Sequence, residues 1–106
     1  MSNDLVKIAV VADIPAGEAK VFKVEDISVA ICNVDGKYYA LENVCTHDNG
    51  PLGEGKLIGT QIECPRHGAR FDIVSGAVRR QPAYGPVATF PLQVKNEEIF
   101  IDISDY

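Results

Sequence analysis

Two short segments of this chain each contain one cysteine and one histidine, and they constrain the fold more than any other feature. Cys45 and His47 are separated by one residue, and Cys64 and His67 are separated by two. They account for both histidines and for two of the three cysteines among the 106 residues. Because thiolate and imidazole groups bind transition metals, we expect the fold to bring both segments together around a metal centre.

One cysteine and one histidine from each segment form the ligand set of a [2Fe–2S] cluster, with two thiolates on one iron and two imidazoles on the other. The predicted ligands are Cys45, His47, Cys64 and His67. Zinc is the alternative, because it also accepts two cysteines and two histidines. Common zinc patterns place two cysteines together and then two histidines, whereas each segment here is mixed. The iron–sulfur interpretation is therefore favoured over zinc, and four unrelated structural residues are favoured least.

The surrounding residues resemble those of Rieske iron–sulfur proteins, and in particular the small soluble ferredoxins of bacterial ring-hydroxylating dioxygenases. The resemblance covers about residues 43–86 and rests on Cys45-Thr46-His47, Gly50-Pro51-Leu52, Gly55, Cys64-Pro65-Arg66-His67-Gly68 and Phe71-Asp72. It implies a one-electron carrier with one Rieske [2Fe–2S] cluster, and not an enzyme. Such a carrier passes electrons from an NAD(P)H-dependent flavoprotein reductase to a terminal ring-hydroxylating oxygenase. The alternative is a Rieske-type small subunit of a larger oxidoreductase complex such as a nitrite reductase.

The positions around the predicted ligands also indicate a low reduction potential. Rieske centres span roughly −150 to +300 mV. High-potential relatives carry a disulfide between the two ligand loops, where this chain has Gly50 and Arg66. They also carry serine and tyrosine hydroxyls that donate to the cluster sulfurs, where this chain has Ala69 and Phe71. Because a donor to sulfur stabilises the extra electron, we expect a potential near the low end of the range.

Composition limits the other roles of the chain. The net charge of −5 argues against nucleic-acid binding, which basic residues drive. No leader and no apolar run near eighteen residues occurs, so we expect neither a membrane span nor a signal peptide. We also expect a monomer in the cytoplasm. Cys32 is the third cysteine and has none left to pair with once Cys45 and Cys64 bind metal, which fits a reducing compartment. Gly53 and Gly55 are interpreted as ordinary loop glycines.

The charges of the chain are unevenly distributed. All four arginines lie between residues 66 and 80, and the stretch 64–86 has four basic residues and one acid, giving +3. The other 83 residues have six lysines and fourteen acids, giving −8. One interpretation of this basic stretch is a solvated surface without a specific role. The functional interpretation is a basic rim beside the cluster that orients an acidic redox partner. The candidate docking residues are Arg66, Arg79 and Arg80.

Short runs typical of strands, separated by turn residues, predict an all-β antiparallel domain. Asp35-Gly36 predicts a two-residue type I′ hairpin, and Gly59-Thr60 predicts a second hairpin. The expected strands are Leu5–Val11, Lys20–Val24, Ile27–Val34, Lys37–Leu41, Leu57-Ile58, Gln61-Ile62, Val87–Val94 and Ile99–Ile103. The resemblance implies a single Rieske domain over 1–106. Its antiparallel β-sandwich or barrel base (1–42 and 85–106) would carry an inserted cluster-binding subdomain (about 43–84).

Overall fold

The structure is a computed structural model that describes residues 5–43, 52–64, 68–80 and 86–103. Its regular elements are antiparallel strands and two single-turn 3₁₀ helices, which confirms the all-β prediction. In chain order they are β1 (Leu5–Val10), η1 (Val11–Asp13), β2 (Ala19–Val24), β3 (Ile27–Val34), β4 (Lys37–Glu42), η2 (Leu52–Glu54), β5 (Lys56–Ile58), β6 (Gln61–Glu63), β7 (Arg70–Asp72), β8 (Val78–Arg80), β9 (Thr89–Phe90), β10 (Leu92–Lys95) and β11 (Glu98–Asp102). No described helix is long and apolar enough to cross a membrane.

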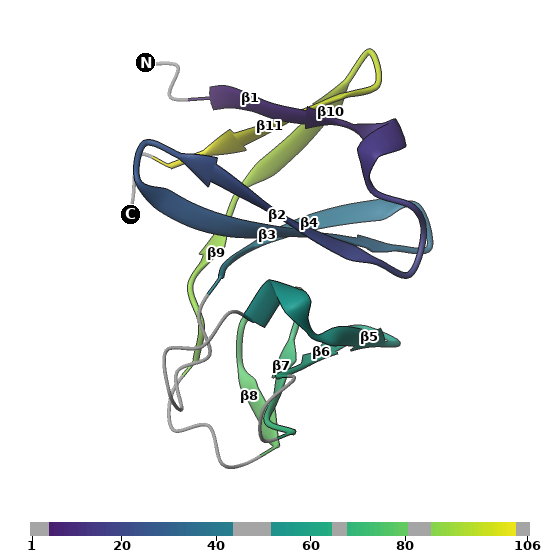
Figure 1. The fold of residues 1–106 in the computed structure, drawn as a ribbon, viewed down its shortest axis with the longest axis vertical. Helices are drawn as coiled ribbons and strands as arrows, with labels where there is room; N and C mark the ends of the chain where they lie inside the picture. The colour runs from purple at the N-terminus through teal and green to yellow at the C-terminus, as the bar shows by residue number, and fades with distance from the viewer. Residues whose placement is uncertain (1–4, 44–51, 65–67, 81–85, 104–106) are drawn as a thin grey trace.

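The strands form three sheets that are stacked along the long axis of the molecule (Figure 1). The outer sheet has the order β1-β11-β10, so strands from both ends of the chain pair with each other. The middle sheet has the order β2-β3-β4-β9, and the cluster-side sheet has the order β5-β6-β7-β8. The cluster-side sheet takes all its strands from within the predicted insertion, whose exact limits stay a prediction.

The middle sheet has apolar cores on both of its faces, which explains the four consecutive apolar residues 29–32 of β3. Successive side chains of a strand point to opposite faces, so a strand buried on both faces has little alternation. Val29 and Ile31 lie in the core shared with the outer sheet, together with Ala9, Ile14, Val24, Ala40, Phe90, Ile99 and Ile101. Cys32 lies in the core shared with the cluster-side sheet, together with Leu41, Leu52, Ile62, Cys64, Ala69, Phe71, Ile73 and Val87.

Both predicted hairpins are confirmed by the backbone. Asp35 and Gly36 have φ angles of 52° and 89°, as a type I′ turn between β3 and β4 requires. Gly59 has a φ of 60° at the turn between β5 and β6. Because Asp and Gly tolerate positive φ better than most residues, these turns could be predicted from the sequence.

The predicted strand over Val87–Val94 is wrong as a single element. It divides at Pro91 into β9, which pairs with β4, and β10, which pairs with β11. Proline has no backbone N–H to donate to a sheet ladder, so pairing stops there and the chain passes from the middle sheet to the outer sheet. Two short strands, β7 and β8, were not among the predicted elements.

Candidate metal centre

Cys64 directly follows β6 and begins the second ligand loop. Its backbone N–H donates to the carbonyl oxygen of Ala69 (2.7 Å), and its own carbonyl oxygen accepts from the N–H of Gly68 (3.2 Å). Gly68 has a φ of 78°, a conformation that glycine adopts without strain. These two backbone hydrogen bonds close the loop without using the thiol of Cys64, which remains available as a ligand.

The thiol of Cys64 is held among apolar side chains. Cys64 is 1% exposed, and Ile62, Ala69 and Phe71 in the same core are each 0% exposed. Ile62 and Phe71 are cross-strand partners on the inner face of the cluster-side sheet, so the sheet register fixes their positions beneath the loop. Neither Ala69 nor Phe71 has a hydroxyl that could donate a hydrogen bond to sulfur.

The other predicted ligands, Cys45, His47 and His67, lie outside the described residues. Described residues do fix both ends of the first ligand loop. The N–H of Asn43 donates to the Ser28 carbonyl oxygen (2.9 Å), and the side-chain Oδ1 of Asn43 accepts from the N–H of Gly53 (2.6 Å). Asn43 therefore joins the residues that precede and follow the loop. Nothing in its sequence context distinguished it from an ordinary polar residue.

Gly53 and Gly55 are required by close packing, and their interpretation as ordinary loop glycines is wrong. A Cβ atom at Gly53 would lie 3.0 Å from Oδ1 of Asn43 and 2.5 Å from Cγ2 of Val21. A Cβ atom at Gly55 would overlap the carbonyl oxygen of Glu63. A larger residue at Gly53 would displace η2 from Asn43, and one at Gly55 would displace the end of β6, which leads into Cys64.

Cys32 and Cys64 lie in the same apolar core, and neither forms a disulfide with a described residue. Burial raises the pKa of the Cys32 thiol to about 12, so Cys32 remains protonated at neutral pH. Cys64 differs because it begins a loop that contains a histidine three residues later. A buried thiol that is free of a disulfide fits a thiolate ligand of a [2Fe–2S] cluster, and the donor set predicted around it matches that group.

The sequence profile of the Rieske [2Fe-2S] domain matches residues 4–91. The chain is 33% identical to the ferredoxin component of a naphthalene 1,2-dioxygenase system from Pseudomonas putida, over 98% of this chain and 100% of that one. It is 38% identical to the ferredoxin subunit of a 3-phenylpropionate/cinnamic acid dioxygenase from Shigella boydii, over 90% of each chain. The similarity therefore extends across almost the whole chain.

Solved structures agree with the sequence comparison. The ferredoxin of carbazole 1,9a-dioxygenase from Nocardioides aromaticivorans IC177 matches with a TM-score of 0.90 and 28% identity, over 94% of this chain and 98% of that one. A ferredoxin in a complex of reduced oxygenase and oxidized ferredoxin in carbazole 1,9a-dioxygenase matches at 0.87 and 30%, over 95% and 94%. A putative nitrite reductase small subunit matches at 0.80 but only 16% identity, over 92% and 96%, which shows the fold alone.

These matches settle the choice that the ligand pattern left open between iron–sulfur and zinc. The matched profile and both relatives are of iron–sulfur carriers, so the zinc alternative is wrong. The chain belongs to the Rieske [2Fe–2S] family, and within it this protein is a ferredoxin that carries electrons on one [2Fe–2S] cluster and is not itself an enzyme.

Proposed function

We propose that this chain accepts single electrons from an NAD(P)H-dependent flavoprotein reductase and passes them to a terminal ring-hydroxylating oxygenase. The observation that carries the proposal is the nearly full-length similarity to ferredoxin components of two dioxygenase systems. The similarity to a ferredoxin solved in complex with an oxygenase supports the choice of acceptor. The two relatives serve systems for naphthalene and for 3-phenylpropionate, so the proposal extends to an aromatic substrate and not to one named compound.

The proposed ligands are Cys45 and Cys64 on one iron and His47 and His67 on the other. When bound, the cluster supplies a one-electron couple. Cys64 would present its thiolate from the end of β6, where its backbone is already hydrogen-bonded within the loop. Ile62 and Phe71 exclude water from the side of Cys64 that faces the core. The imidazole edges of His47 and His67 away from the iron would face the partner and form the electron port.

Ala69 and Phe71 support the expected low potential. Both side chains are fully buried next to Cys64, and neither has a hydrogen-bond donor that would stabilise the reduced state. A low potential suits a carrier that is reduced by a nicotinamide-linked flavoprotein. A measured midpoint well above 0 mV would contradict this part of the proposal, which places the potential near the low end of roughly −150 to +300 mV.

We further propose that the protein works as a diffusible monomer in the cytoplasm. Its free buried thiol at Cys32 is compatible with a reducing compartment. The alternative is a small subunit fixed within a larger oxidoreductase, such as a nitrite reductase. Because the similarity to that subunit reaches only 16% identity, it favours the fold and not the function. Size-exclusion chromatography of the protein from its native host distinguishes a free monomer from a subunit of a complex.

The first experiment is an EPR spectrum of the dithionite-reduced protein beside its visible absorption when oxidised. A red-brown protein whose rhombic signal has a mean g below the free-electron value would establish the histidine-ligated [2Fe–2S] centre. A second assay would reconstitute the reductase and oxygenase of the naphthalene system with NAD(P)H. Substrate oxidation that depends on adding this protein supports the proposal, whereas a normal EPR signal without turnover would contradict the assigned partners alone.

A further inference from the structure

A row of four charged side chains crosses the cluster-side sheet. The strand register pairs Lys56 with Glu63, Glu63 with Arg70, and Arg70 with Arg80. Cross-strand partners point to the same face of a sheet. A register shift between β7 and β8 lets Arg80 share this face although Val78, two residues earlier, packs against the core. We call Lys56, Glu63, Arg70 and Arg80 the charged row. It contains three cations and one anion, and its net charge is +2.

The opposite face of the same sheet is apolar. The adjacent row pairs Leu57 with Ile62, Ile62 with Phe71, and Phe71 with Val78. These four side chains belong to the core around Cys64. The strands therefore alternate between inner residues that hold the ligand loop and outer residues that face solvent. Packing explains the inner row, but it does not require three cations on the outer one.

The cations of the charged row are not equally constrained. Nε of Arg70 lies 3.2 Å from Oε2 of Glu63, and the two side chains are 30% and 19% exposed. Nζ of Lys56 lies 3.9 Å from Oε1 of Glu63, and Nη1 of Arg80 lies 3.9 Å from Oε2 of Glu63. The side chains of Lys56 and Arg80 are 74% and 59% exposed. Exposed ion pairs at such distances contribute little to stability. Glu63 and Arg70 thus form a fixed centre, while Lys56 and Arg80 can exchange Glu63 for carboxylates of another molecule.

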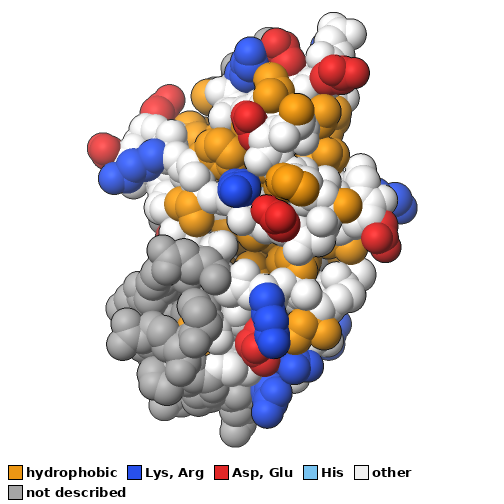
Figure 2. Space-filling view, turned by 45° about the vertical axis from the view of Figure 1, so that its right-hand side comes forward, with side chains coloured by type: hydrophobic (Ala, Val, Ile, Leu, Met, Phe, Trp, Pro, Cys, Tyr) orange, Lys and Arg blue, Asp and Glu red, His pale blue; other side chains and the backbone are white. Residues whose placement is uncertain are grey.

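The charged row lies directly beside the second ligand loop, where a partner that exchanges electrons with the cluster would bind. Glu63 immediately precedes Cys64, and Arg70 immediately follows Ala69, whose carbonyl oxygen closes the second ligand loop. The row therefore lies at the loop end of β6 and β7. Figure 2 shows Lys and Arg side chains gathered around an acidic side chain on this part of the surface.

The two other sheets have the opposite charge. Their described residues, 5–43 and 86–103, include five lysines and nine acids. Among the predicted docking residues, Arg80 belongs to the charged row, whereas Nη2 of Arg79 is paired with Oδ2 of Asp72 at 3.2 Å. Arg66 lies outside the described residues. The described residues of the cluster-side sheet and its loops, 52–64 and 68–80, include four basic residues and three acids, so this part is +1 and the other two sheets are −4. Such a charge difference orients a charged protein before contact.

We propose that the charged row is the docking surface for an acidic patch of the terminal oxygenase. The inference rests on the proposed function, and it adds which face of this chain meets the acceptor and which charge the acceptor carries there. Carboxylates of the oxygenase bind Lys56 and Arg80, and Glu63 keeps Arg70 in place between them. Docking there places Cys64 and Ala69, which bound the second ligand loop at the ends of β6 and β7, close to the oxygenase.

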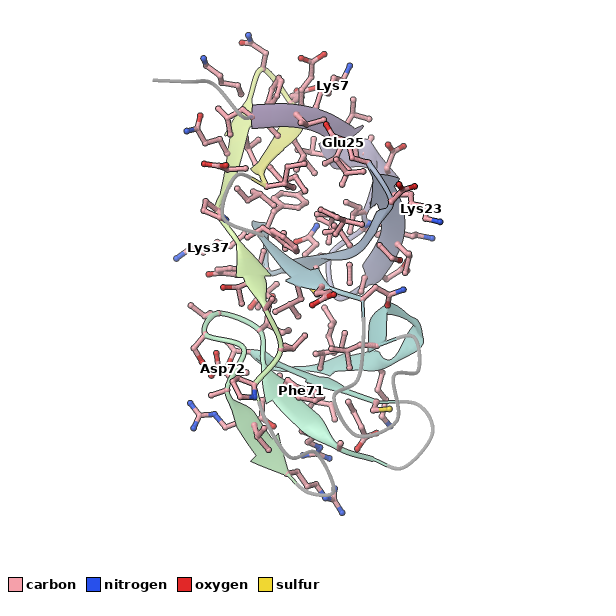
Figure 3. All side chains as sticks on the ribbon, turned by 90° about the vertical axis from the view of Figure 1, so that its left-hand side faces the viewer. Lys7, Lys23, Glu25, Lys37, Phe71 and Asp72 are labelled. Carbon is pink, nitrogen blue, oxygen red and sulfur yellow. The ribbon has the colours of Figure 1, made fainter. Side chains whose placement is uncertain are left out.

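The test compares two double variants with the same change in net charge. Lys56→Glu with Arg80→Glu reverses the ends of the charged row, and Lys23→Glu with Lys37→Glu reverses two exposed lysines elsewhere. Lys23 and Lys37 form no ion pair with a residue that the structure describes, and they lie on the middle sheet, away from Phe71 and Asp72 (Figure 3). Electron transfer from the reduced protein to the oxygenase component of the naphthalene 1,2-dioxygenase system is followed by stopped flow. The salt concentrations are about 0.01 M and about 0.15 M.

At low salt, the Lys56/Arg80 variant is expected to transfer electrons about tenfold more slowly than the natural protein, because it loses electrostatic steering. The Lys23/Lys37 variant should stay within about threefold, and the difference should shrink at high salt. Equal losses in both variants would overturn the docking inference alone. So would a loss confined to reduction of this protein by the reductase. Natural protein that reduces no oxygenase would overturn the assigned acceptor, and the docking inference with it.

Placing two further acids beside Glu63 could unfold the sheet, so neutral variants form a second arm. Lys56→Gln with Arg80→Gln is compared with Lys23→Gln with Lys37→Gln, and the visible absorption of the cluster confirms folding in each. The row variant should be slower by about threefold at low salt, with the control unchanged. Identical rates in both neutral variants, with the cluster intact, would contradict the proposal without reference to stability.

Discussion

The middle sheet and the cluster-side sheet use their faces differently. In β3 of the middle sheet, every residue from Val29 to Asn33 is buried, because apolar cores lie on both sides. In β7 of the cluster-side sheet, Phe71 is buried between Arg70 and Asp72, which both face outward. The comparison shows how one fold separates two tasks. Packing determines most side chains of β3, whereas in β7 the side chains on either side of Phe71 lie on the outer face of the sheet, beside Cys64.

The largest expected effect distinguishes two buried thiols that share one core. Cys64→Ala should abolish the visible absorption and the iron content of the purified protein, because it removes one of the four proposed ligands. Cys32→Ala should keep both, and should lower the free energy of unfolding by about 1 kcal/mol through the lost core atom. Iron and sulfide analysis beside denaturant unfolding checks both variants. Cluster loss in the Cys32 variant, or full iron in the Cys64 variant, would refute the ligand assignment.

The next effect tests whether the inner face of the cluster-side sheet supports the ligand loop. Phe71→Ala should lower the free energy of unfolding by about 4 kcal/mol, because Phe71 is fully buried. Phe100→Ala is the matched control, because Phe100 lies half-buried on β11 of the outer sheet and should cost about 1 kcal/mol. Unfolding is followed by far-UV circular dichroism and by visible absorption. In the Phe71 variant alone, bleaching of the cluster should shift to lower denaturant than in the natural protein.

Two glycines with similar φ angles should differ less in the free energy of unfolding that they lose on substitution. Gly76 and Gly36 have φ angles of 80° and 89°, but a Cβ atom at Gly76 would overlap the carbonyl oxygen of Val87, whereas Gly36 has open space. Gly76→Ala should cost about 3 kcal/mol, from backbone strain and displacement of Val87, and Gly36→Ala about 1 kcal/mol from strain alone. Thermal unfolding of both variants measures the difference. Equal losses of free energy of unfolding in the two variants would show that the segment at Val87 shifts to accommodate the added methyl group.

Turn chemistry and apolar runs could be read from the sequence, because both depend on local residues. Asp35-Gly36 predicted its hairpin, and the run Ile27–Val34 predicted a strand, which the structure shows to be buried on both faces. The break between β9 and β10 falls at Pro91, which lies within the strand predicted over Val87–Val94. The apolar residues on both sides of Pro91 favour a continuous strand, so the prediction missed the break. The strands β7 and β8 have three residues each, too few for a periodic pattern, and cross-strand packing defines them.

The candidate site was predictable in its ligand chemistry and not in its surroundings. Cys64 could be singled out because a cysteine three residues before a histidine is a local pattern. Lys56 and Glu63 lie outside the arginine-rich stretch 64–86, and only the register of four strands aligns them with Arg70 and Arg80. Asn43 acts through a contact ten residues away, at Gly53. Such relations arise from tertiary structure, so a charge count along the chain could indicate a basic region but not its geometry.

The smallest expected effect concerns Asp72, whose carboxylate accepts hydrogen bonds from the turn that follows β7 on the outer face of the cluster-side sheet. The N–H of Ser75, which donates to its carboxylate at 2.9 Å, is the main reason that its pKa lies below the ordinary value. Burial acts in the opposite direction, and Arg79 and the N–H of Val74 add to the lowering. Because the folded state favours the ionised form, this stabilisation is present above the ordinary pKa. It is lost as the pH falls through the lowered value.

Asp72→Ala should therefore lower the free energy of unfolding by about 1 kcal/mol at neutral pH, and the difference from the natural protein should shrink as the pH falls below the ordinary pKa of an aspartate. Glu98→Ala is the matched control, because the 2.9 Å ion pair of Glu98 with Lys7 is more exposed, and its removal should cost less than about 0.5 kcal/mol. Thermal unfolding at a series of pH values measures both variants. If both variants lose the same free energy of unfolding at every pH, the hydrogen bonds of the Asp72 carboxylate do not stabilise the turn. The outer face near Cys64 would then hold its conformation through β-sheet pairing alone.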